Sequence, residues 1–176
     1  MRKNIVFTLT GSDRVGIVES VTKMLLEYDG NVESSRMARL GGEFAMLMLV
    51  SVPVDQLLNL EKGVEKFSQQ GFKVTVSQTD QSYALKYAGW LPYQIEVKGA
   101  DHEGIIHQVA QYLTKRGINI ETMDTGIIQA PMSGTPLFTM VAVVMTPPGL
   151  SSKDWGNQLD DVADELNVDI QVTTVK

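Results

Sequence analysis

The sequence predicts an α+β protein made of two copies of one βαββαβ unit, each an antiparallel four-stranded sheet with both helices on one face. The first observation is a repeat at the offset that separates Gly11 from Gly99. At this offset Gly11, Asp13, Gly16, Ile17, Val21 and Leu25 return as Gly99, Asp101, Gly104, Ile105, Val109 and Leu113. The second observation is that the alternating apolar residues Ile5, Phe7 and Leu9 return as Tyr93, Ile95 and Val97. Because alternate strand residues face one side, both copies keep the same buried face.

Local signals define the first half of each unit. In the first copy, residues 4–10 alternate as a strand. Ser12 or Asp13 offers an N-cap for a helix that ends at Gly30 and has Val15, Val18, Val21 and Leu25 on one face. Residues 32–40 and 43–52 are β-rich runs around Gly41-Gly42, where glycines can adopt the positive φ angles of a tight hairpin, and Pro53 ends the second run.

A second helix and a closing strand complete the unit. In the first copy the helix is marked by Leu57, Leu60, Val64 and Phe67, and after Gly71 the strand is marked by Phe72, Val74 and Val76. In the second copy the same elements are marked by Trp155, Leu159, Val162 and Leu166, and by Val168, Ile170 and Val172. With right-handed crossovers this order folds as the ferredoxin-like arrangement.

The repeat predicts a first domain at 1–80, a linker at 81–91 and a second domain at 92–176. The linker contains aromatic residues rather than the Gly and Ser of a flexible tether, so we expect it to pack against a domain. The hairpin loop of the second copy is longer, over 129–136, and is either a binding lid or surface variation. One face of each sheet stays open, which favours pairing of the two copies or formation of a homodimer, and we expect both.

Composition excludes several functions. Among 176 residues, 15 Lys and Arg oppose 21 Asp and Glu, and a formal charge of -6 argues against direct nucleic-acid binding. The absence of cysteine excludes disulfides, thiolate metal sites and a cysteine nucleophile. The longest apolar run, 44–50, is far shorter than the ~20 residues that span a bilayer, so we expect a cytoplasmic protein without membrane association.

The strongest candidate site is the loop Asp13-Arg14-Val15-Gly16-Ile17 and its copy Asp101-His102-Glu103-Gly104-Ile105. Each lies at a strand-to-helix turn, where free backbone amides and a glycine suit the capture of a small carboxylate. The carboxylates of Asp13 and Asp101 and the amide oxygens of Asn31 and Asn119 suit an ammonium group. The alternative interpretation is that each Asp is a helix cap and each Gly a packing requirement.

Enzyme and metal signatures are missing from the sequence. His102 and His107 are five residues apart, whereas the zinc motif H-E-x-x-H needs a spacing of four to place both on one helix face. The sequence contains no G-x-S-x-G elbow, P-loop or G-x-G-x-x-G fingerprint. Arg36 and Arg39 are interpreted as an exposed charge set on a strand. We therefore predict no catalytic residue, no metal and no cofactor.

The two units, each opening with a strand and D-x-x-G-[IV], resemble tandem ACT domains, the small-molecule regulatory module of amino-acid metabolism. Within that superfamily, Asp13–Val18 and the stretches 31–37 and 40–44 are similar to the glycine cleavage system transcriptional repressor family. The resemblance implies a non-enzymatic regulator that responds to an amino acid, with glycine suspected, and that contacts a DNA-binding activator of glycine cleavage genes.

ACT modules commonly bind amino acids between two paired units, using the strand-to-helix loop of one and the second strand of the other. Carried over by position, the predicted ligand-binding residues are Asp13, Arg14, Gly16, Ile17 and Asn31, and Asp101, His102, Gly104, Ile105 and Asn119. Two alternatives remain at this stage. One is a regulatory fragment of an enzyme such as formyltetrahydrofolate deformylase, and the other is a ligand-free structural pairing module.

Overall fold

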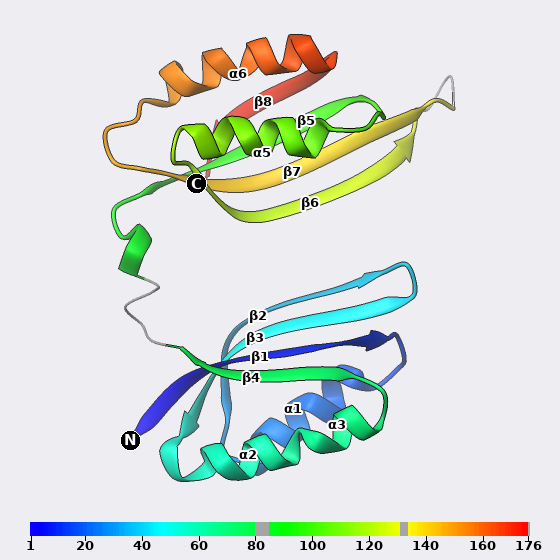
Figure 1. The fold of residues 1–176 in the computed structure, drawn as a ribbon, viewed down its shortest axis with the longest axis vertical. Coiled ribbons are helices and arrows are strands. Elements are labelled where there is room, and N and C mark those ends of the chain that lie inside the picture. Colours follow the sequence, from blue (N-terminus) through cyan, green and yellow to red (C-terminus); the bar gives the residue numbers. More distant parts are fainter. Residues whose placement is uncertain (80–84, 131–133, 176) are drawn as a thin grey trace. The chain divides into compact units, whose positions relative to one another are not determined.

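The computed structural model describes residues 1–79, 85–130 and 134–175, and the chain divides into two compact units, Met1–Lys86 and Tyr87–Lys176 (Figure 1). The predicted linker 81–91 and the longer loop 129–136 both include residues outside the described ranges, so the domain limits 1–80 and 92–176 stay predictions. The described part of the linker contains a short 3-10 helix, η2 (Leu85–Tyr87). The ring of its last residue, Tyr87, meets the ring of Trp90 edge to face, with the centroids 4.8 Å apart.

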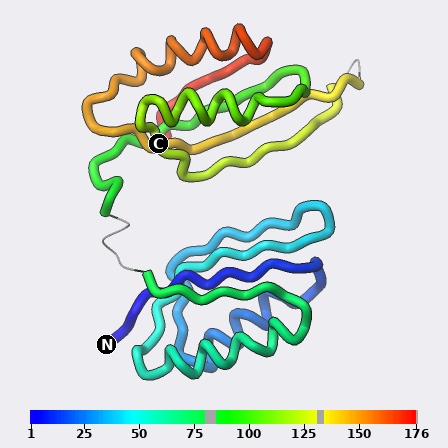
Figure 2. Tube along the Cα trace, in the orientation of Figure 1, coloured from blue at the N-terminus to red at the C-terminus, as the bar shows by residue number. Residues whose placement is uncertain are grey.

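Each unit contains the antiparallel four-stranded sheet that the sequence predicts. The first sheet is formed by β1 (Arg2–Ser12), β2 (Asn31–Leu40), β3 (Glu43–Pro53) and β4 (Lys73–Thr79), in the order β2-β3-β1-β4. The second is formed by β5 (Leu91–Ala100), β6 (Asn119–Gln129), β7 (Pro136–Thr146) and β8 (Val168–Thr174), in the order β6-β7-β5-β8. The N-terminal strand, dark blue in Figure 2, runs between β3 and β4. The predicted fold class is confirmed.

The helices of each unit cover one face of its sheet (Figure 1). In the first unit they are α1 (Ile17–Glu27), the 3-10 helix η1 (Val54–Gln56), α2 (Leu57–Gly63) and α3 (Glu65–Gln69). In the second unit they are α5 (Ile105–Lys115) and α6 (Ser152–Leu166). No helix in the described part of the chain has the length and apolar character needed to cross a membrane.

Two separate hydrophobic cores lie between the helices and the sheets. The predicted alternation is confirmed, because Ile5, Phe7 and Leu9 are fully buried in one core and Ile95 and Val97 in the other. Trp155 of α6 is buried in the second core, where its ring meets that of Tyr93 edge to face. None of the described helices of a unit lies on the opposite face of its sheet (Figure 1).

The predicted start of the first helix is wrong. Gly16, rather than Ser12 or Asp13, is the N-cap residue of α1, and no side chain caps the helix. Val15 precedes the helix and is fully exposed, and Val18 is 41% exposed. Because the helix begins at Ile17, the apolar stripe that it buries runs through Ile17, Val21, Met24 and Leu25.

The second helix of the first unit is interrupted, which the periodicity did not indicate. It divides at Val64 into α2 and α3, which bury Leu57 and Leu60, and Phe67, respectively. The predicted apolar positions therefore still face the core, although one continuous helix does not form.

Candidate functional site

Each candidate loop ends in a glycine with a left-handed backbone. Gly16 has φ 92° and ψ 1°, and Gly104 has φ 95° and ψ −9°, so both adopt a conformation that L side chains rarely take. Their carbonyl oxygens accept the first helical hydrogen bonds, from the amides of Ser20 and Gln108, at 2.9 and 3.0 Å. No side chain caps either helix, which leaves the first-turn amides available to an anion.

The space beside these glycines is open. Apart from the glycine and its two chain neighbours, no described atom lies within 4 Å of the position that a Cβ would take at Gly16 or at Gly104. A small carboxylate can therefore approach the backbone at either loop. The similarity of the two loops in conformation, with the same role at the start of α1 and α5, follows the sequence repeat.

Asp13 and Asp101 tie their loops to the neighbouring hairpins. The amide of Asp13 donates to the Gly42 carbonyl at 2.9 Å, and the amide of Asp101 donates to the Pro136 carbonyl at 3.4 Å. The Asp13 carboxylate faces Arg39 of β2, with Oδ2 3.7 Å from Nε, and one third of its side chain is exposed. The sequence analysis interpreted Arg39 as part of an exposed charge set. The spacing of Asp13 and Arg39 in the sequence gives no sign that their side chains meet.

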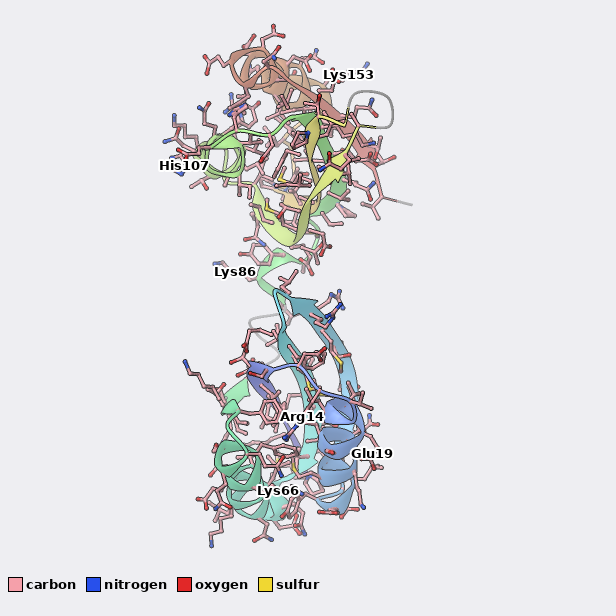
Figure 3. All side chains as sticks on the ribbon, turned by 90° about the vertical axis from the view of Figure 1, so that its right-hand side faces the viewer. Arg14, Glu19, Lys66, Lys86, His107 and Lys153 are labelled. Carbon is pink, nitrogen blue, oxygen red and sulfur yellow. The ribbon has the colours of Figure 1, made fainter. Side chains whose placement is uncertain are left out.

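Arg14 and His102 each contact the C-terminal end of a later helix in their own unit, α3 and α6, respectively. Arg14, labelled in Figure 3, donates from Nη2 to an acceptor near the end of α3. The acceptor is Gln70 Oε1, at 2.5 Å, and the Arg14 guanidinium lies 4.6 Å from the centroid of the Phe72 ring. His102 Nε2 lies 2.7 Å from the carbonyl oxygen of Leu166, and its Nδ1 lies 3.1 Å from that of Glu103. These carbonyls, that of Leu166 first and then that of Glu103, raise the pKa of His102. Both side chains thus brace the loops.

Ile17 and Ile105 contribute their side chains to the cores. Ile17 is 4% exposed and Ile105 is 1% exposed. A ligand at either loop can therefore meet the backbone of these residues but not their side chains.

Asn31 lies far from the loop of its own unit. Asn31 pairs with Ser51, and Ser51 pairs with Asn4 near the start of β1, whereas Asp13 follows the last residue of β1, Ser12. Asn4 and Ser12 are eight residues apart on one strand, which corresponds to about 26 Å. Asn119 is placed in the same way at the start of β6. One unit therefore cannot bring its loop and its asparagine onto one small ligand.

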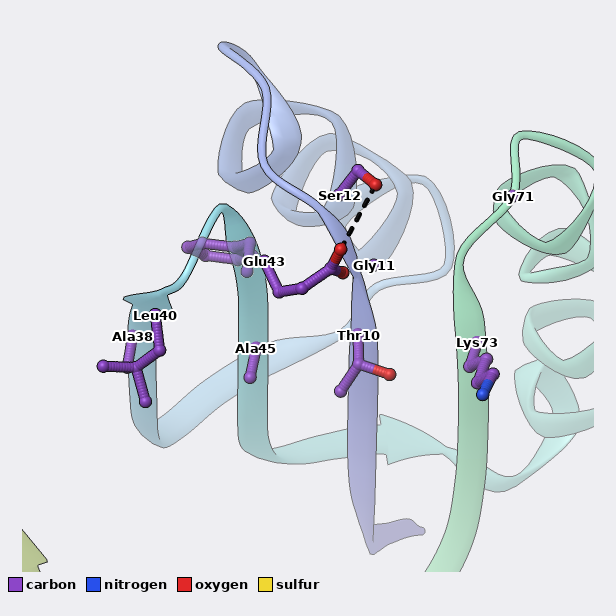
Figure 4. Close-up of a pocket in the computed structure, with 10 residues that line it drawn as sticks. Thr10, Gly11, Ser12, Ala38, Leu40, Glu43, Ala45, Gly71 and Lys73 are labelled. Atoms are coloured by element: carbon purple, nitrogen blue, oxygen red, sulfur yellow. Dashed lines mark hydrogen bonds between the residues drawn. The ribbon is translucent and has the colours of Figure 1, made fainter.

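Two cavities lie away from the candidate loops. The first has a volume of about 360 Å³, and it opens on the sheet face without helices, among residues of β1, β2, β3 and β4 that include Thr10, Glu43 and Lys73 (Figure 4). A second cavity of about 300 Å³ lies beside α6 and β8. None of the predicted ligand-binding residues lines either cavity.

His107, whose spacing from His102 does not fit the zinc motif, projects from the exposed side of α5 (Figure 3). Within the ranges 1–79, 85–130 and 134–175, no three His, Cys, Asp or Glu side chains are arranged to hold a metal ion.

Comparison with known proteins identifies the fold family. A family model described as "ACT domain" matches residues 3–77. Residues 3–77, nearly the whole first unit, belong to the ACT domain family, and the second unit repeats the strand order of the first. A crystal structure of an unknown protein from Galdieria sulphuraria is 34% identical, covers 100% of both chains and has a TM-score of 0.87. The structure of a proposed glycine cleavage system transcriptional repressor has the same fold, with a TM-score of 0.72 over 100% of this chain and 99% of that one at 20% identity.

One relative of known role is a transcriptional repressor, and it matches a short stretch of this chain. The glycine cleavage system transcriptional repressor of Escherichia coli (strain K12) is 45% identical over 47 residues, which are 27% of this chain and 25% of the repressor. The chain thus matches about a quarter of the length of that relative. The chain is therefore similar to the repressor over this stretch, and its two units share the fold of the matched ACT domain.

Proposed function

We propose that this ACT protein is a non-enzymatic regulator that binds a small amino acid, with glycine as the leading candidate. The observation that carries the proposal is the repeated open helix N-terminus at Gly16 and Gly104, where uncapped amides and free space meet. Such a terminus favours a carboxylate, because the amides donate hydrogen bonds and the helix dipole is positive there.

The ammonium group of the amino acid needs acceptors. The carboxylate of Asp13 or Asp101 and the amide oxygen of Asn31 or Asn119 provide them, since an ammonium group only donates. Glycine has no side chain to recognise, so its affinity depends on these two charged ends.

The site requires two ACT units. Because a loop and an asparagine of one unit lie at opposite ends of its sheet, a ligand that contacts both must lie between units. In this proposal a second copy of the chain supplies the other unit, in a homodimer. The edge strands β2 and β6 suit this pairing, because their outer backbone groups have no strand neighbour in the described sheets.

We propose further that the protein works in the cytoplasm by contact with a DNA-binding activator of glycine cleavage genes. The 45% identity to the repressor supports this partner. A net charge of -6 favours an indirect route to DNA over direct phosphate binding.

Calorimetric titration of the purified protein with glycine, alanine and serine tests the amino-acid site. We expect saturable binding of glycine that Asp13→Ala or Asp101→Ala abolishes. Asp55→Ala is the control, because it removes an exposed carboxylate in η1 and not in either loop. Capture of the activator, measured with and without glycine, tests the partner. Absence of both binding events would contradict the proposal and indicate a ligand-free pairing module.

A further inference from the structure

A hydrogen-bonded network surrounds Asn31 at the start of β2. Glu33 Oε1 accepts hydrogen bonds from Asn31 Nδ2 and from Ser51 Oγ, both at 2.9 Å. Arg2 donates from Nε to Ser51 Oγ at 3.2 Å and from Nη2 to the Ser51 carbonyl at 2.6 Å. The Ser51 hydroxyl thus acts both as a donor, to Glu33, and as an acceptor, from Arg2.

A β-bulge places the Glu33 carboxylate in this network. The register of β2 against β3 shifts between Val32 and Ser34, so Glu33 is the extra residue and has no cross-strand partner. Its side chain instead meets Asn31 and the cross-strand partner of Asn31, Ser51, which is 8% exposed. The hydrogen bonds from Asn31 and Ser51, and then the charge of Arg2, lower the pKa of Glu33.

The chemistry of these groups determines how the Asn31 amide is oriented. An ionised carboxylate only accepts hydrogen bonds, so the amide must turn its nitrogen toward Glu33. Among the described residues the amide oxygen then has no hydrogen-bond donor, and it lies on an exposed side chain. An ammonium group needs such an oxygen and would be repelled by the amide nitrogen.

The second unit lacks this network, although its sequence repeats the Asn-x-Glu motif. Asn119 pairs with Met145, which has no hydroxyl, and Trp90 occupies the repeat position of Arg2. The bulge is kept at Glu121, but in the described part of the chain this carboxylate makes no hydrogen bond. Asn119 Nδ2 donates instead to the adjacent Ile120 carbonyl at 3.3 Å.

We propose that Glu33 is a positioning residue that orients the Asn31 amide oxygen toward the ammonium group of the bound amino acid. The first unit therefore supplies the working asparagine, and Asn119 of the second unit does not. This inference rests on the proposed function, in which Asn31 contacts an ammonium group.

Glycine titration of the full-length protein tests the proposal. Glu33→Leu removes the acceptor and is expected to weaken glycine binding about fivefold to tenfold. Glu33→Gln keeps an oxygen that accepts both hydrogen bonds and is expected to restore affinity to within about twofold of the unaltered protein. Glu121→Leu is the matched control and is expected to leave affinity unchanged. Equal melting temperatures of the variants would show that the loss is not one of folding.

A second readout separates this inference from the function on which it rests. In a ¹⁵N–¹H correlation spectrum without ligand, the chemical shift of the Asn31 side-chain amide reports its hydrogen bond to residue 33. We expect this chemical shift to change much less in Glu33→Gln than in Glu33→Leu. Glycine binding that Glu33→Leu leaves unchanged, or that Glu121→Leu weakens equally, would overturn the inference. If Glu33→Leu moves the Asn31 signal but the unaltered protein binds no glycine, alanine or serine, the proposed function fails and the ligand role of Glu33 fails with it.

Discussion

The imidazole of His102 joins the β5–α5 loop to the C-terminal end of α6, because its Nε2 lies 2.7 Å from the carbonyl oxygen of Leu166. The other ring nitrogen faces the carbonyl of Glu103. A carbonyl oxygen only accepts, and neutral imidazole can donate from one nitrogen only, so the protonated ring satisfies both contacts. The helix end adds a negative partial charge that favours the same form.

This arrangement predicts a pH-dependent stability of the second unit. The folded-state pKa of His102 is raised, so its stabilisation is fully present below its unfolded-state pKa of about 6.5 and is lost as pH rises through the folded-state value. We expect the melting temperature to fall across this window, and His102→Gln to reduce that fall. His107→Gln, which alters an exposed histidine of α5, should leave the fall unchanged. An NMR titration of His102 with a pKa below 6.5 would contradict the prediction.

Arg14 braces the first unit as His102 braces the second. Arg14→Ala removes the hydrogen bond to Gln70 and the contact with the Phe72 ring. Because the guanidinium is exposed to solvent, we expect a loss of about 1 kcal/mol in the free energy of unfolding, measured by urea denaturation. Arg36→Ala, at an exposed arginine that bonds to the neighbouring Ser35 carbonyl, is the control and should change the free energy less.

Two glycines of the second unit should respond to alanine in opposite directions. Gly156 lies inside α6 with no atom within 4 Å of a new Cβ, so Gly156→Ala is expected to stabilise the unit by about 0.5–1 kcal/mol. Gly104 is equally open but has φ 95°, so Gly104→Ala is expected to destabilise it by about 1 kcal/mol. Thermal unfolding of both variants measures the signs. Equal signs would contradict the left-handed backbone at Gly104.

The hydroxyl of Tyr112 connects the two helices of the second unit. It donates a hydrogen bond from α5 to the backbone carbonyl of Trp155 in α6, and burial raises the pKa of this phenol. Tyr112→Phe keeps the ring in the core and removes only the hydroxyl, so we expect a loss of about 1 kcal/mol in the free energy of unfolding. In the described residues the Tyr28 hydroxyl makes no hydrogen bond, and Tyr28→Phe should leave the first unit nearly unchanged.

Much of the fold could be predicted because its signals are local. Strand alternation and glycine at turns are properties of neighbouring residues, and they predicted the element order and the cores. The repeat from Gly11 to Gly99 presented the same local signals twice. The predicted start of α1 was wrong because Asp13 has the chemistry of an N-cap. The left-handed turn at Gly16 instead makes the helix begin at Ile17. The carboxylate of Asp13 pairs with Arg39 instead, which depends on contact between segments far apart in the chain.

By itself the sequence determined two copies of one unit, the buried face of each strand, and the pair of loops at Gly16 and Gly104. The tertiary structure alone decided that Asn31 lies at the opposite end of the sheet from Asp13. It also decided that Ser51, which Arg2 contacts, donates to Glu33, whereas Met145 is the cross-strand partner of Asn119. The physical reason is that cross-strand neighbours depend on register and on β-bulges, which pair residues that no local spacing relates.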